Sequence, residues 1–270
     1  MLQALQLYAA GYYKAAGAEA SAIRATDSYT EQQREFLVAA CEQQKQLLLQ
    51  SPHVLQKQHP QQLQQMLHCS NPAIQALALF LLSTRYCQTE QHPERQQMQK
   101  QLQELGRTCA AAAFLAAASA AETNPVGALQ LCNNCTTPEM RALRLQLLLR
   151  IHREDRAKMQ LESDIASGAY ETAEQSISRA LYHLWEGDAV SAEASLTDAE
   201  MALSLRAGDV SALIENGRAA CAMQRGDFQT ASERLNNLLT VAPWDESALC
   251  NAICCFRRLH KNALADELSE

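Results

Sequence analysis

The chain has 270 residues, of which 30 are acidic and 23 basic, giving a net charge of −7. It holds 46 alanines and 38 leucines against only 6 valines and 7 isoleucines, and aromatic residues make up 5%. Because strands favour β-branched and aromatic side chains, this composition excludes a substantial sheet and predicts an all-α fold. The acidic balance provides no basic stripe to neutralise phosphates, which argues against nucleic-acid binding.

The sequence predicts neither a membrane span nor a secretory signal. The longest apolar run, Cys109 to Ala121, is shorter than the roughly 20 residues that cross a bilayer. The stretch from Met1 to Tyr8 lacks positive charge and resembles an amphipathic helix. We therefore expect a soluble intracellular protein with no direct membrane insertion, whose ten cysteines are free thiols.

Turn signals divide the first half of the chain into divergent helical pairs. They fall at Gly11 and Tyr12, near Gln44, at Cys87 to Pro93, and at Glu122 to Pro125. A longer interval between His59 and Asn71 predicts an extra short helix. Glutamines between Gln43 and Gln103 interleave with leucines at helical spacing, which favours solvent-facing helix positions over disorder.

No motif points to an enzyme. Cys132 and Cys135 form a CxxC pair, but no strand precedes it for a redox site, and no further ligands at defined spacing complete a zinc site. Cys254 and Cys255 are adjacent on a predicted helix, so we expect one thiol in the core and one exposed. Phosphate loops, nucleophile motifs and paired catalytic carboxylates do not occur. We expect no catalytic, metal or cofactor site. A thiol-dependent enzyme using the CxxC pair is the enzymatic alternative.

The clearest repeat runs from Ala212 to Pro243 and resembles a tetratricopeptide repeat. The small residues Ala219 and Ala231 would let two antiparallel helices approach closely. Further positions match the motif: Gly226 for a left-handed turn, Asp227 as a helix cap, Phe228, Leu235 and Leu238 as apolar contacts, and Pro243 at the start of the next helix.

The same pattern recurs 39 residues earlier in the chain, at Ala180, Gly187, Asp188, Ala192, Leu196 and Ala199. Asp209, in the connection between these repeats, is the expected N-cap of the helix that follows it. A turn is expected at His152 to Asp155, and another helix from Asp245 to about His260. We predict an all-α solenoid of about seven tetratricopeptide-like hairpins. Residues 1–270 would form a single domain, with divergent repeats in 1–135 and clearer ones in 138–270.

The first helix of each such hairpin lines a concave face that can hold an extended or helical segment of a partner. In the register of the clear repeats, the predicted partner-facing residues are Gln146, Leu149, Arg150, Ile177, Leu181, Leu184, Trp185, Asn216, Ala220 and Met223. Four of them, Ile177, Leu181, Leu184 and Trp185, form an apolar strip. They could instead pack against neighbouring helices, although a groove tryptophan is a typical partner anchor.

With the repeats in register, the chain resembles the epsilon subunit family of coatomer, the COPI vesicle coat. The most specific stretch is Leu213 to Phe228, which resembles the family's Asn-Gly-Gln-Ala-Ala-Cys run and the turn after it. Weaker matches are Leu7 to Tyr13, Asn124 to Leu129, and Asp155 to Lys158. The resemblance covers nearly the whole chain and is strongest between about 124 and 255.

The resemblance implies a non-enzymatic coat subunit. It would bind the C-terminal region of the coatomer alpha subunit, lie in the cytoplasm and peripherally on Golgi and COPI vesicle membranes, and support Golgi-to-ER retrograde and intra-Golgi transport. Family members usually add further helices beyond the position of Glu270. The alternative is a repeat adaptor or co-chaperone scaffold. Such adaptors clamp a carboxylate with Lys and Asn, and among the corresponding positions here only Asn216 fits.

Overall fold

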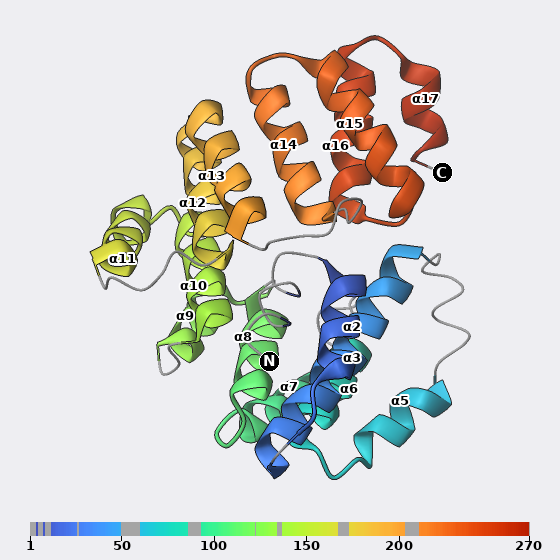
Figure 1. The fold of residues 1–270 in the computed structure, drawn as a ribbon, viewed down its shortest axis with the longest axis vertical. Coiled ribbons are helices and arrows are strands. Elements are labelled where there is room, and N and C mark those ends of the chain that lie inside the picture. The colour runs from blue at the N-terminus through green and yellow to red at the C-terminus, as the bar shows by residue number, and fades with distance from the viewer. Residues whose placement is uncertain are drawn as a thin grey trace. The chain divides into compact units, whose positions relative to one another are not determined.

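The computed structural model describes residues 12–25, 27–49, 60–85, 93–121, 123–133, 137–166, 173–202 and 211–269, together with Ala4 and Tyr8. The described elements are all helices (Figure 1). Their bounds are α2 Tyr13–Ala22, α3 Ser28–Leu49, α5 Pro60–Leu67, α6 Pro72–Arg85, α7 Pro93–Leu105, α8 Ala110–Ala121, α9 Pro125–Cys132, α10 Pro138–Arg150, α11 Glu154–Ala166, α12 Ala173–Glu186, α13 Ala189–Ala202, α14 Ala212–Gln224, α15 Phe228–Val241, α16 Glu246–Arg258 and α17 Asn262–Glu267.

The prediction of an all-α chain of helical hairpins is confirmed. Consecutive helices pack as antiparallel-type pairs at α6 with α7, α8 with α9, α12 with α13, α14 with α15, and α16 with α17. The short helix α5 lies in the interval where an extra helix was expected. No described helix combines the length and the apolar character needed to cross a bilayer.

The chain divides into two compact units, which we describe separately. The first unit comprises mainly residues 20–40 and 56–163, and the second mainly residues 2–19, 41–55 and 164–270. That the hairpins form a single continuous domain stays a prediction.

In the first unit, α6 packs against α5, α7 and α8, and α8 packs against α9 and α10. Asn71 fixes the start of α6: its side-chain oxygen accepts a hydrogen bond from the Ala73 amide at 3.0 Å. The Asn71 amide group donates to the Gln32 carbonyl of α3 at 2.9 Å. One buried side chain, 2% exposed, therefore caps a helix and ties it to an earlier one.

In the second unit, α12 and α13, α14 and α15, and α16 and α17 form three successive hairpins. Ala219 and Ala231 are both 0% exposed and lie in one core cluster with Leu235 and Leu238, as the repeat pattern predicts. Gly226 has a φ of +79°, and the Asp227 side chain accepts a hydrogen bond from the Thr230 amide at 3.0 Å. The tetratricopeptide interpretation of this region is therefore supported at its turn, its cap and its core.

Four first helices end in the same way, which marks the repeat register. The residues at these ends, His152, Gly187, Gly226 and His260, all have positive φ. In each case the next amide donates to the carbonyl five residues earlier, as Asp227 does to Ala222 at 3.0 Å and Lys261 to Phe256 at 2.9 Å. This is the hydrogen bond of a Schellman motif. At the ends of α10 and α16 a histidine, rather than a glycine, occupies this position.

Several sequence expectations are wrong or fall outside the described residues. α3 continues through Gln44, because Ser28–Leu49 contains neither Gly nor Pro. Pro243 lies in a turn, and α16 is capped by Asp245, whose side chain accepts from the Ala248 amide at 2.8 Å. α14 is capped by Ser211. The expected cap Asp209 and the expected turns at Gly11 and Cys87 lie outside the described residues.

Candidate partner-binding surfaces

The first helices of the second unit bring together seven of the ten predicted partner-facing residues. α12 contacts α14, and α14 contacts α16. The side chains of these seven residues are partly or largely exposed: Ile177, Leu181, Leu184 and Trp185 on α12, and Asn216, Ala220 and Met223 on α14. Trp185 is 44% exposed. α12 therefore presents apolar side chains that its own hairpin does not fully bury.

Two side-chain hydrogen bonds join these first helices across the hairpins. The Gln224 amide donates to the Leu184 carbonyl, which links α14 to α12. The Asn251 amide donates to the Asn216 side-chain oxygen at 2.9 Å, which links α16 to α14. The spacing of the three helices is thus fixed by directional contacts as well as by apolar packing.

Asn216 and Gly217 form the Asn-Gly pair of the stretch that resembles the family, and each residue makes a contact with a neighbouring helix. Asn216 receives the bond from Asn251. At Gly217, a Cβ atom would lie 3.0 Å from Cδ1 of Leu196 on α13, closer than ordinary van der Waals contact. The glycine therefore allows α13 and α14 to approach closely.

The three remaining predicted residues lie on α10 in the first unit. Gln146 and Arg150 are exposed, and the Arg150 guanidinium donates to the Ala121 carbonyl at the end of α8 at 3.1 Å. Leu149 is only 2% exposed and so offers no surface to a partner. The reason is that α10 is buried along much of its circumference, since Leu145, Leu147 and Leu148 are also at most 2% exposed.

An ion-pair network holds α13, α14 and α15 together. The Arg218 guanidinium contacts Glu200 of α13 at 2.6 Å and Glu215 of its own helix at 2.7 Å. Arg234 of α15 reaches Glu215 at 3.2 Å. Partial burial alone would lower the pKa of Arg218, but its hydrogen bonds to the two carboxylates outweigh this and raise it. Arg218 therefore remains charged at the centre of the network.

The cysteines in the described part of the chain differ in their burial. The eight cysteines in the described part of the chain are free thiols. Cys254 is exposed and Cys255 buried, as predicted, and burial raises the pKa of the Cys255 thiol to about 11. Cys132 is 2% exposed, and Cys135 lies outside the described residues. Within the described ranges, no three His, Cys, Asp or Glu side chains are grouped to hold a metal ion.

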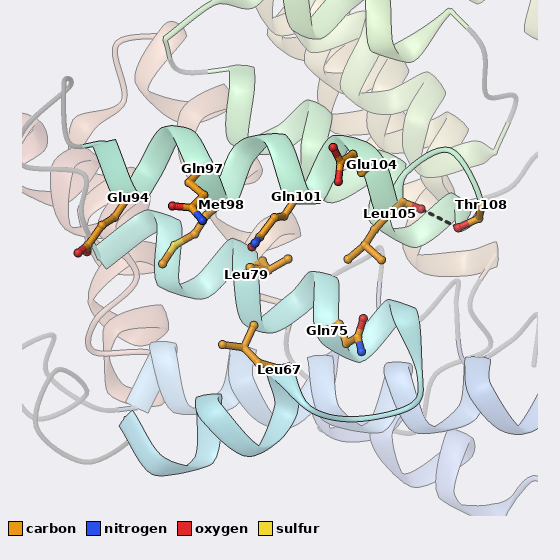
Figure 2. A pocket seen from close by; sticks show the side chains of 10 residues that line it. All are labelled: Leu67, Gln75, Leu79, Glu94, Gln97, Met98, Gln101, Glu104, Leu105 and Thr108. Carbon is orange, nitrogen blue, oxygen red and sulfur yellow. Dashed lines mark hydrogen bonds between the residues drawn. The ribbon is translucent and has the colours of Figure 1, made fainter.

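A pocket of about 650 Å³ opens on the first unit between α5, α6 and α7 (Figure 2). Leu79 and Gln75 come from α6, and Leu67 from α5. α7 and the turn after it contribute Glu94, Gln97, Met98, Gln101, Glu104, Leu105 and Thr108. The glutamines at 97 and 101 are exposed, as predicted for this segment. Helical spacing places Gln97 and Gln101 on one face of α7 with Glu94, Met98 and Leu105. The pocket itself was not predicted, because it forms only where this face meets α5 and α6.

The hairpins have small residues where their helices touch. Their first helices end at a residue with positive φ, and their second helices begin with a side-chain cap. These features define a helical-repeat protein, a class whose members commonly bind protein segments. The sequence signature described as coatomer epsilon subunit matches residues 6–269. The chain therefore belongs to the coatomer epsilon subunit family, and the resemblance noted in the sequence is confirmed.

Two plant relatives show how far the pairwise likeness extends. The proteins named coatomer subunit epsilon-2 in Oryza sativa subsp. indica and in Oryza sativa subsp. japonica are each 31% identical to the chain over 142 residues. The aligned stretch covers 53% of this chain and 46% of each relative. The match thus spans about half the length of these relatives.

Proposed function

We propose that the protein is a non-enzymatic structural subunit of the COPI vesicle coat. It would bind the C-terminal region of the coatomer alpha subunit and support Golgi-to-ER retrograde and intra-Golgi transport. It would lie in the cytoplasm and reach Golgi and COPI vesicle membranes peripherally, through the coat. Family membership over residues 6–269 supports the coat role.

The observation that carries the binding role is the partly exposed apolar strip of α12. Ile177, Leu181 and Leu184 are only partly buried, and Trp185 is 44% exposed beside them. A tryptophan next to aliphatic side chains is a common anchor in protein interfaces, since its burial removes a large apolar surface from water. The alpha-subunit segment would cover this strip.

The co-chaperone alternative finds less support. The corresponding positions on α12 are the aliphatic residues Ile177 and Leu181, which cannot bind a carboxylate. Asn216 is the one side chain at these positions that could donate to a carboxylate, and no lysine accompanies it at the other corresponding positions. Recovery of chaperones without coat subunits in a pull-down from native cell extract would contradict the coat proposal. We expect one-to-one recovery of the alpha subunit.

The variant Trp185→Ala with Leu181→Ser tests the strip. We expect binding to the alpha subunit's C-terminal region to weaken at least about thirtyfold, because truncating an interface tryptophan commonly costs about 2 kcal/mol or more. The measurement is a titration of the purified proteins. Trp244→Ala is the matched control, since Trp244 is 42% exposed but lies in the turn before α16.

Circular dichroism separates a binding defect from a folding defect. The double variant should retain the helical signal of the unchanged protein. If helicity is lost, the four residues belong to the core and the strip is not a partner surface. If the control loses affinity as much as the double variant does, binding does not depend on α12.

A further inference from the structure

A row of exposed side chains along α13 carries no charge, although the chain as a whole has a net charge of −7. The row consists of Val190, Ala194, Thr197 and Met201, all of which are exposed. Intervals of four, three and four residues place these side chains on one face of the helix. Val190 is 72% exposed and Met201 67%, so both ends of the row remain largely uncovered. We call it the α13 row.

The equivalent row of α15 is polar throughout. The offset of 39 residues between the two repeats maps the α13 row onto Gln229, Glu233, Asn236 and Thr240, which are also exposed. The fold of this repeat therefore accepts polar side chains at these positions and does not require apolar ones. Adjacent apolar side chains on an exposed face, unlike single scattered ones, are typical of a contact surface.

The acidic side chains beside the row are each paired within the chain. The pairs are Glu193 with Arg225 at 2.6 Å, Asp198 with Arg179 at 3.5 Å, and Glu200 with Arg218 at 2.6 Å. Because an arginine offsets each carboxylate, the flanks of the row repel a second acidic surface less than three unpaired charges would. The Thr197 hydroxyl donates to the Glu193 carbonyl of its own helix at 3.0 Å, so it needs no hydrogen-bond partner in a contact.

The α13 row has the same order in both directions along the helix. Its intervals of three and four residues are those of a coiled-coil seam. When two such helices run antiparallel, Val190 of one lies opposite Met201 of the other, and Ala194 lies opposite Thr197. The larger side chains then meet at both ends, while the smaller ones meet in the middle and let the helices approach closely. A two-fold contact uses the same patch on both partners, so the surface that matches this row is a second α13 row.

We propose that two copies of this chain associate by pairing their α13 rows antiparallel about a two-fold axis. α13 has 14 residues, which corresponds to about 21 Å of helix. A single helix pair of that length buries less than the roughly 1,200 Å² of a stable complex. The dimer is therefore weak and forms at high protein concentration. This inference concerns α13 and does not depend on the contact proposed for α12.

The test is sedimentation equilibrium of the full chain over a wide range of protein concentration. The unchanged protein should self-associate as its concentration rises. Ala194→Lys and Thr197→Glu should each weaken self-association at least about tenfold, because each buries an unpaired charge in the contact. Mixed in equal amounts, the two variants should associate at least about tenfold more tightly than either alone. The reason is that the antiparallel register places the introduced lysine opposite the introduced glutamate.

Gln229→Lys and Asn236→Glu are the matched controls, because they introduce the same charges on the equivalent row of α15. They should self-associate like the unchanged protein, and circular dichroism should show that every variant keeps its helical signal. Trp185→Ala with Leu181→Ser should also self-associate normally, so a failure of this inference is distinguished from a failure of the proposed function. An unchanged protein that stays monomeric at every concentration, equal loss in the controls, or no gain on mixing would overturn the proposal.

Discussion

His152 and His260 adopt backbone angles that favour glycine. Their φ values are 55° and 59°, against 83° for Gly187 and 79° for Gly226 at the equivalent helix ends. The left-handed region costs a residue with a Cβ atom about 1 kcal/mol or more. The ends of α10 and α16 are therefore formed with some strain, which the hydrogen bonds of the Schellman motif offset.

His260→Gly should consequently stabilise the protein. We expect a gain of about 0.5–1 kcal/mol and a rise in the melting temperature of a few degrees, measured from the helical circular dichroism signal. Gly226→Ala is the reciprocal control and should lower the melting temperature. No atom lies within 4 Å of an added Cβ there, so the loss would come from backbone strain alone. A lower melting temperature for His260→Gly would contradict this explanation.

The caps of α13 and α15 predict a specific dependence of stability on pH. Hydrogen bonds from Ser191 hold the pKa of Asp188 below its usual value, and those from Thr230 do the same for Asp227. Because the folded-state pKa is lowered, the stabilisation is present above the unfolded value of about 4 and is lost as pH falls through the folded pKa.

Asp188→Asn with Asp227→Asn should therefore flatten the fall in melting temperature below about pH 4. Asparagine caps helices about as well as aspartate, so stability near neutral pH should change little. A melting series across this range is the measurement. An unchanged acid dependence would mean that other carboxylates dominate, for example Asp155, whose pKa is lowered to about 2 by its hydrogen bond with Arg153.

Among the elements, α14 is joined to α13 by an ion pair of Arg218. The Arg218 side chain is 15% exposed and bonds both Glu200 and Glu215. Arg218→Met would leave two partly buried carboxylates without this partner, and we expect a loss of about 1 kcal/mol in denaturant unfolding.

Arg257→Met provides the comparison for this change. Its ion pair with Asp266 is short, at 2.6 Å, but the two side chains are 50% and 62% exposed. Exposed pairs contribute little because water screens them. If both variants lose the same stability, the burial of Arg218 is not what matters.

The sequence predicted those elements whose signals are local. Gly226 and Asp227 marked a helix end and a cap because backbone angle and side-chain oxygen act within a few residues. The end of α16, which was predicted at about His260, has a histidine where α14 has a glycine. The pocket and the burial of Leu149 could not be predicted, because both depend on which face of α7 or α10 meets another helix. That choice is made by tertiary packing rather than by spacing along one helix.

At the scale of the whole molecule, the apolar strip of α12 and the pocket between α5, α6 and α7 lie in separate units. The α12 strip belongs to residues 164–270 and the pocket to residues 56–163. Each unit has its own buried clusters, for example Ala117, Ala128 and Met140 in the first and Ala219, Ala231 and Leu235 in the second. A surface substitution in one unit is therefore expected to leave the core of the other intact.

The bonds from Gln224 to the Leu184 carbonyl and from Asn251 to Asn216 also bear on how the second unit can bend. Packed methyl groups can slide over one another at small cost, but a hydrogen bond is lost once its donor and acceptor separate by about an ångström. A change in the angle between α12 and α14 would therefore break the first bond, and a change between α14 and α16 would break the second. A ligand that binds to α12, α14 and α16 would therefore meet a curvature that is already set in the free protein. Little of the binding free energy would be lost to a conformational change of the protein.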